Sequence, residues 1–211
     1  MSQSQLATVL RQHIAALPPD EQRGSRTRCL LLTHGIKPQV AEALTKLVAP
    51  HAVVEPHFNW SPAGFASPDE IRLDQADGFV SPEHRETLAD WWLEVRRHAN
   101  TPNWDLVSQA TIDGRAALVL VEAKAHSTEL HSSGKNRDGN ARNHEQIGRA
   151  IAEANDSLTQ LSPGWHLSCD SHYQLANRFA WAWKLASMGI PVVLVYLGFL
   201  GADEMGDRGK P

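Results

Sequence analysis

Three charged residues, Asp105, Glu122 and Lys124, have the types and spacing of a hydrolytic site. They lie in the stretch NWDLVSQATIDGRAALVLVEAKAH, residues 103–126. Two carboxylates beside an ammonium group can hold a divalent cation and stabilise the negative charge that develops when a phosphodiester is hydrolysed. The same residues also fit a solvated strand end that carries an ordinary Glu-Lys pair.

An Asp-Gly pair at residues 113–114 predicts how these side chains are positioned. Between two runs rich in strand-forming residues, Asp-Gly is typical of a two-residue hairpin turn. Counting back from such a turn along both strands places Asp105 directly opposite Glu122. Because side chains alternate along a strand, Glu122 and Lys124 share a face, and so do cross-strand partners. We therefore expect all three groups on one face of the sheet, at the end away from the turn.

Directly opposed carboxylates repel each other, and a strand of Ala, Leu and Val has no structural need for them. A divalent cation between Asp105 and Glu122 would remove the repulsion. Mg²⁺ typically takes one or two carboxylates and completes its shell with water or phosphate oxygens. We expect Mg²⁺ or Mn²⁺ as the cofactor, and we expect Lys124 to orient or deprotonate a water and to stabilise the transition state.

A helix upstream of the hairpin could supply a third acid. Ser81 is a suitable N-cap, Pro82 suits the first helical position, and the helix is predicted to run to about His98. Glu94 is the candidate third acid on this helix. An acidic flank exposed to solvent is the alternative.

A second helix is predicted over residues 171–188. Gln174, Asn177 and Arg178 lie at i, i+3 and i+4 and form a polar stripe, which suits hydrogen bonds to phosphate or to the site carboxylates. The stripe could equally be the solvated side, because Leu175 and Phe179 on another face can supply the core.

The remaining chain predicts further elements. A buried strand is expected at residues 28–33, a helix at 39–48, and a short strand at 51–55. A long polar loop with Lys135, Arg137 and Arg142 follows the hairpin and could close over a phosphate backbone or simply be a surface loop. Asn143 is the expected N-cap of a helix over 143–157, with Gln146 at the capping-box position. The strand 192–197, apolar on both faces, should be central in its sheet.

Composition limits the class of protein. The chain has 211 residues, of which 42% are hydrophobic and 21% charged, as in a soluble globular domain. A net charge of −4 argues against a protein that coats nucleic acid non-specifically. No apolar run has the length of a membrane span, so we expect no membrane association and a cytoplasmic location. Cys169-x-x-His172 has no second ligand pair, so structural zinc is not expected.

The order of helix, strand with Asp105, hairpin, strand with Glu122-Ala123-Lys124, two helices and strand resembles the PD-(D/E)XK nuclease superfamily. The resemblance covers roughly residues 82–199. It implies an α/β protein with a restriction-endonuclease-like αβββαβ core, in which helices flank a central mixed sheet. One departure is that Trp104 stands where the family has proline. Another is that no third core strand is obvious near the hairpin, and it could come from the N-terminal region.

We accordingly expect an N-terminal α/β extension over 1–80, a nuclease-like core over 81–200 and a tail over 201–211. The first functional hypothesis is metal-dependent hydrolysis of nucleic acid, with DNA the preferred substrate, acting alone, as a homodimer or with a partner protein. The second is a catalytically inactive binding or scaffold module of the same fold.

Overall fold

The structure, a computed structural model, describes residues 3–126, 132–136 and 139–200. The tail 201–211 and Arg137 lie outside these ranges. The α-helices are α1 (Gln3–Ala15), α2 (Ser25–Thr33), α3 (Lys37–Val48), α4 (Pro82–Trp92), α5 (Ala141–Leu161) and α6 (Tyr173–Ser187). The strands are β1 (Trp60–Ser61), β2 (Leu106–Ile112), β3 (Arg115–Lys124) and β4 (Val192–Gly198). Among the described helices none is both long and apolar enough to cross a membrane.

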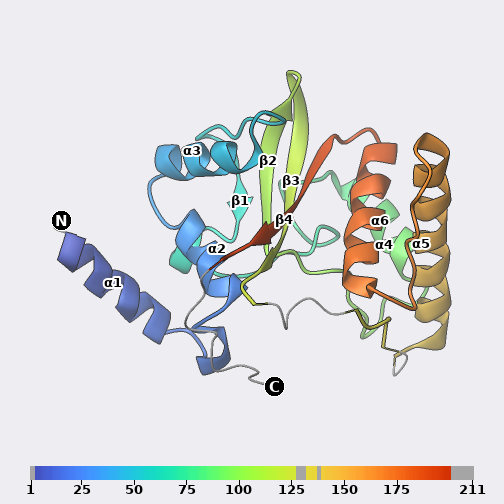
Figure 1. The fold of residues 1–211 in the computed structure, drawn as a ribbon, viewed down its shortest axis with the longest axis horizontal. Coiled ribbons are helices and arrows are strands. Elements are labelled where there is room, and N and C mark those ends of the chain that lie inside the picture. Colours follow the sequence, from blue (N-terminus) through green and yellow to red (C-terminus); the bar gives the residue numbers. More distant parts are fainter. Residues whose placement is uncertain (1–2, 127–131, 137–138, 201–211) are drawn as a thin grey trace.

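The four strands form one mixed sheet in the order β1-β2-β3-β4 (Figure 1). β1 and β3 both run antiparallel to β2, whereas β4 runs parallel to β3. The protein is therefore a mixed α/β fold, as predicted. β1 precedes α4 in the chain, so the third antiparallel strand comes from the N-terminal region.

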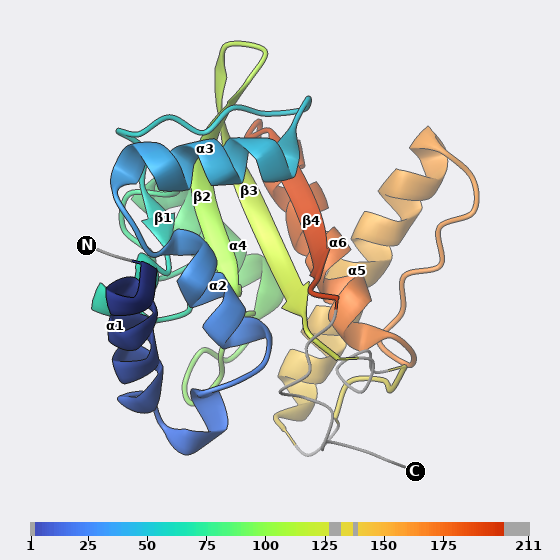
Figure 2. The ribbon, with the colours of Figure 1, turned by 60° about the vertical axis from the view of Figure 1, so that its left-hand side comes forward.

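Helices cover both faces of the sheet (Figure 2). Alternation along β3 divides its side chains between two cores. Leu118 and Leu120 pack with residues of α4, α5 and α6, whereas Val119 and Val121 pack with residues of α2 and α3. Glu122 continues the first series and so lies on the α6 side of the sheet.

The hairpin prediction is confirmed. Ile112 pairs with Arg115, and Asp113 and Gly114 both have positive φ, at 48° and 73°. Positive φ at both central positions is the signature of the type I′ turn, which matches the twist of the two strands.

Two predictions for the N-terminal region are wrong. Residues 28–33 belong to helix α2, in which Cys29 and Leu30 are fully buried, and a short apolar run cannot by itself be distinguished as buried strand or buried helix. Residues 51–55 form no strand, and only Val53 pairs, as an isolated bridge, with Thr111.

β4 lies at an edge of the described sheet and not at its centre. Its residues are mostly half-buried, and Tyr196 is 38% exposed. Helix α6 is rotated relative to the prediction: Leu175 is 40% exposed, whereas Asn177 and Arg178 are buried. The buried face instead combines Arg178, which pairs with Glu122 of β3, with Trp181 and Leu185.

The predicted cap of α5 is also wrong. Asn140, three residues earlier, is the N-cap, and its side chain accepts hydrogen bonds from the backbone of Arg142 and Asn143. Asn143 is buried and bonds instead to the backbone of Val95. Gln146 donates to the carbonyl of Trp91 at 2.8 Å and so links α5 to the end of α4.

Two glycine substitutions should change stability in opposite directions. A Cβ at Gly114 or at Gly148 would meet no atom within 4 Å, so each change tests backbone preference alone. Gly114→Ala should lower the free energy of unfolding by about 1 kcal/mol, because alanine disfavours positive φ. Gly148→Ala, inside α5, should raise it by up to about 1 kcal/mol. Urea denaturation measures both, and a loss of stability in both variants would contradict the description of these two sites.

Candidate active site

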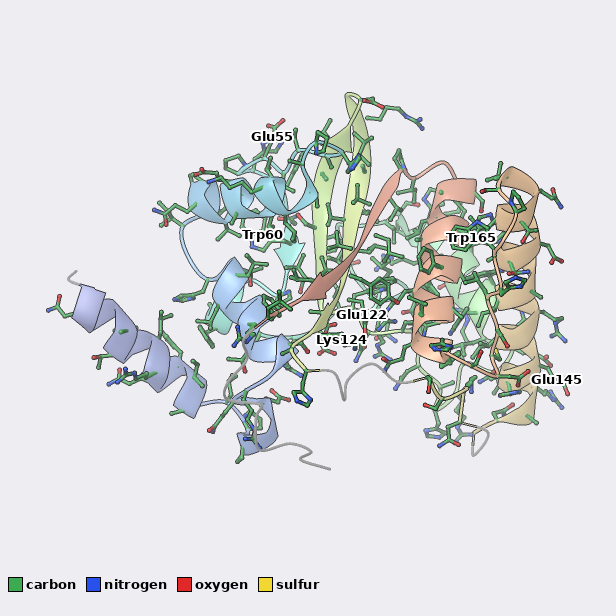
Figure 3. All side chains as sticks on the ribbon, in the orientation of Figure 1. Glu55, Trp60, Glu122, Lys124, Glu145 and Trp165 are labelled. Carbon is green, nitrogen blue, oxygen red and sulfur yellow. The ribbon has the colours of Figure 1, made fainter. Side chains whose placement is uncertain are left out.

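A cavity of about 520 Å³ opens at the end of the hairpin away from its turn. It is lined by the predicted Asp105, Glu122, Lys124, Gln174, Asn177 and Arg178, and also by Glu70, Trp92, Asn100, Thr101, Pro102, Asn103, Asn136 and Tyr173. Glu122 and Lys124 lie where β3 ends, beside α6 (Figure 3). The fold therefore brings together six of the seven residues that the sequence analysis selected.

Asp105 lies at the point where β2 begins. The ladder between β2 and β3 ends at Leu106 and Val121, one pair short of the predicted opposition of Asp105 and Glu122. The carboxylate continues the contact, because its Oδ2 accepts a hydrogen bond of 2.7 Å from the backbone N–H of Ala123. The side chain of Asp105 is thus fixed against β3 in the place where a backbone carbonyl would otherwise pair.

Glu122 is a buried acid, with 2% of its surface exposed. Its Oε1 lies 2.6 Å from Nζ of Lys124, and its Oε2 lies 2.6 Å from Nε of Arg178. A buried charge is tolerated only when it is paired and hydrogen-bonded, and here each carboxylate oxygen has a cationic donor. The pairing explains why a carboxylate can stand in the apolar strand β3.

Arg178 is held on all sides. Beyond Glu122, its Nη2 donates to the carbonyl of Asn103 at 2.7 Å and its Nη1 to Oδ1 of Asn177 at 3.0 Å. The guanidinium also lies over the ring of Trp104, 4.7 Å from its centroid, in a cation–π contact. Asn177 is buried behind it, whereas Gln174 is exposed at the rim of the cavity. The polar stripe of α6 therefore faces the site and supports it.

Asp105 titrates far from its ordinary range. Its pKa is raised from 3.8 to about 7, first by burial and then by the neighbouring charges of Glu122 and Glu70, against the lowering effect of the Ala123 N–H and of Lys124. Three carboxyl groups thus influence one another within this cavity.

Glu70 is the site residue that sequence reasoning missed. The backbone of Ile71 pairs with that of Trp104 in an isolated antiparallel bridge, which brings Glu70 beside Asp105. Burial and the charge of Glu122 raise the pKa of Glu70, while Arg26, Arg178 and a hydrogen bond with Asn103 lower it. No local pattern marks this residue, because the bridge joins chain segments more than thirty residues apart.

Glu94 does not lie in the cavity, so the expectation of a third acid from this helix is wrong. Helix α4 ends at Trp92, well before the predicted His98. The carboxylate of Glu94 is directed toward α5, with Arg149 at 3.6 Å and Arg142 at 3.9 Å. The amide of Asn143 binds both the N–H and the C=O of Val95, and this contact holds the chain in an extended course beyond the helix end.

The donors present are of the type that Mg²⁺ prefers. Within the described ranges no group of three or more His, Cys, Asp and Glu side chains could by itself hold a metal ion. Asp105 and Glu122 supply two carboxylates, and Mg²⁺ is commonly bound by one or two carboxylates with water and substrate oxygens. Burial and, after it, the charge of Glu122 raise the pKa of Asp105, and a bound cation would oppose both effects by stabilising the ionised carboxylate. The donor types are those of a two-carboxylate site completed by substrate, and an ion on Glu122 would share its oxygens with Lys124 and Arg178.

Comparisons with known proteins give no relative for this chain: no protein-family model, no curated protein and no solved structure matches it.

The charge of Asp105 should make stability fall as pH rises. Its pKa is higher in the folded protein than in the unfolded chain, so the folded state binds the proton more tightly and loses that advantage between about pH 4 and pH 7. Asp105→Asn keeps the acceptor for Ala123 and removes the titration. Between pH 5 and pH 8 the wild type should lose more free energy of unfolding than the variant, by on the order of 2 kcal/mol. Urea denaturation at the two pH values measures this, and parallel pH profiles would refute it.

The ion pair between Arg178 and Glu122 should show strong coupling in a double-mutant cycle. Arg178→Met leaves a buried carboxylate with Lys124 alone and should cost about 3 kcal/mol of stability. Adding Glu122→Gln to that variant should cost little more, because the charge that needed Arg178 is gone. Denaturation of the two single variants and the double variant gives the coupling energy. Additive losses would show that the two side chains do not depend on each other.

Proposed function

We propose that this protein hydrolyses phosphodiester bonds in nucleic acid, with DNA as the preferred substrate, in a reaction that depends on Mg²⁺ or Mn²⁺. The observation that carries the proposal is the convergence of Asp105, Glu122 and Lys124 in one open cavity, with a carboxyl pKa near neutrality. Strongly shifted carboxyl groups in a cleft are characteristic of functional sites. The resemblance of the motif to PD-(D/E)XK nucleases is consistent with the same chemistry.

The residues divide the work in this proposal. Asp105 and Glu122 would hold the ion, which when bound polarises the phosphate and lowers the pKa of a coordinated water. Lys124, fixed by its contact with Glu122, places a positive charge where negative charge develops on the phosphate and can orient the attacking water. Arg178 positions Glu122 through its fixed guanidinium, and Gln174 at the rim can donate to a phosphate oxygen.

A second function is favoured by one specific observation. Both oxygens of Glu122 already have cationic partners at 2.6 Å, so the charge of this acid is balanced by protein groups alone. Such internal compensation is what a catalytically inactive binding or scaffold module would require. The two functions differ in whether the site binds a divalent ion.

Metal binding and cleavage should both depend on the two acids. Calorimetric titration with Mn²⁺ should give one site in the wild type, weakened at least about tenfold in Asp105→Asn, which corresponds to about 1.4 kcal/mol. Because the ion needs ionised Asp105, affinity should fall as pH drops below about 7. Cleavage of supercoiled plasmid with Mn²⁺ or Mg²⁺ should be lost in Glu122→Ala and reduced about 10²-fold or more in Lys124→Ala.

Glu94→Gln is the matched control, because this acid lies outside the cavity and should keep wild-type metal affinity and cleavage. A wild type that binds no Mn²⁺ and cuts no plasmid, RNA or activated phosphodiester would establish the second function. Loss of activity in Glu94→Gln to the same degree as in Glu122→Ala would refute the assignment of the site.

A further inference from the structure

A second cavity of about 620 Å³ adjoins the candidate active site. The two cavities share Asn100, Asn136 and Tyr173 in their walls, so they lie side by side. We refer to the second cavity as the basic groove. It is lined by Leu93, Arg97, His98, Ala99, Lys135, Gly139, Asn140, Asn143, Ile147 and the three shared residues.

The charge of the basic groove is opposite to that of the neighbouring acid site. Among the residues that the structure describes, its lining contains Arg97, Lys135 and His98 and no acidic residue. Over the described ranges neither Arg97 nor Lys135 forms a salt bridge, and the Nε of Arg97 donates to Nε2 of His98 at 3.3 Å. Four asparagine side chains and the apolar Leu93, Ala99 and Ile147 form most of the remaining lining. Cationic and amide groups without carboxylates suit a phosphate ligand.

The segment that carries Arg97 is fixed to helix α5. Asn143 accepts a hydrogen bond of 2.7 Å from the N–H of Val95 and donates one of 2.8 Å to its carbonyl. Asn143 is only 5% exposed, so its amide supports the wall of the groove and is not available to bind a ligand. The position of Arg97 is thus set by a two-point contact only two residues away.

The segment that carries Lys135 is fixed in a similar way. The N–H of Lys135 donates to the carbonyl of Cys169 at 2.7 Å, and Ser133 pairs with Ser171 in an antiparallel bridge. The two chains approach so closely at Gly134 that a Cβ would lie 2.6 Å from the carbonyl oxygen of Asp170. Nζ of Lys135 lies 5.9 Å from the ring centroid of Tyr173, one of the shared wall residues. Lys135 therefore stands near the junction of the two cavities.

Helix α5 adds to the positive potential of the groove. The helix has 21 residues, and its N-terminal end, at Asn140 and Asn143, forms part of the lining. The first turn is capped by the side chain of Asn140, so the helix contributes its dipole field and not a set of open N–H groups.

We propose that the basic groove binds a backbone phosphate of the same nucleic-acid strand whose neighbouring phosphate is cleaved in the acid site. The inference rests on the proposed function for the identity of its ligand. A strand carries one phosphate per nucleotide, so a chain with one phosphate in the acid site can place a neighbouring phosphate in the adjoining basic groove. Arg97 and Lys135 supply positive charge there, whereas Lys124 and Arg178 of the acid site are both paired with Glu122.

The test is DNA binding without cleavage. A fluorescein-labelled 12-nucleotide single strand is titrated in EDTA, so that no hydrolysis occurs, and anisotropy gives the Kd. Arg97→Gln/Lys135→Gln should raise the Kd about tenfold or more. It should also reduce the slope of log Kd against log salt by about 1.4, since each lost contact with a single strand removes about 0.7.

The matched control is Arg115→Gln/Lys46→Gln, which removes the same two charge types at the hairpin turn and on α3. Its Kd should stay within about twofold of the wild type, and thermal unfolding by circular dichroism compares the folding of both double variants. Arg97→Glu provides a second variant, in which reversed charge should weaken binding more than the neutral change.

The outcomes separate the two proposals. Equal loss of affinity in the two double variants, or no loss in either, overturns the basic groove even if wild-type protein cleaves DNA. Groove-dependent binding by a wild type that never cleaves with Mn²⁺ or Mg²⁺ supports the groove and overturns the hydrolytic function. A wild type that neither binds the strand nor cleaves plasmid overturns both.

Discussion

The buried ion pair between Glu122 and Arg178 joins the central sheet to helix α6 inside the protein. Few charged groups are fully buried in proteins unless they are paired, because desolvation is costly. The pair fixes the end of β3, the face that α6 presents to the sheet, and the position of Lys124 on the other oxygen of Glu122. The rest of the candidate site is arranged around this contact, with Asp105 on the adjacent strand and Asn103 and Asn177 holding the guanidinium.

Because of this ion pair, Glu122 and Asp105 differ in how far positive groups neutralise their charge. Glu122 is compensated by two cations, whereas Asp105 has one backbone N–H and two nearby carboxylates. Glu122 therefore also has a structural role, because its charge is already balanced by Lys124 and Arg178. Asp105, with a pKa raised to about 7, is only partly ionised near neutral pH. Its ionisation would therefore respond strongly to a bound cation.

Local chemistry was enough to predict the hairpin. An Asp-Gly turn determines its own backbone angles, and the alternation of side chains then determines which residues share a face. The placement of Glu122 and Lys124 followed from two short-range rules. Gln174, Asn177 and Arg178 were found by helical spacing, although only the structure shows that Arg178 and not Phe179 faces inward.

Other features depended on contacts between distant segments. The run at residues 28–33 is a helix that packs over the sheet, and six residues are too few for periodicity to distinguish a buried helix from a buried strand. Helix α4 stops early because Val95 is bound by an amide from α5. Glu70 enters the site through a single bridge between Ile71 and Trp104, which both lie outside the helices and strands of the described chain.

The bridge between Ile71 and Trp104 also makes the acid site depend on two separate regions of the chain. The motif on the hairpin does not form the acid site alone, because Glu70, from the chain before residue 81, also lines the cavity. Any rearrangement of the gene that moved the hairpin and its following helices alone would carry the motif without Glu70.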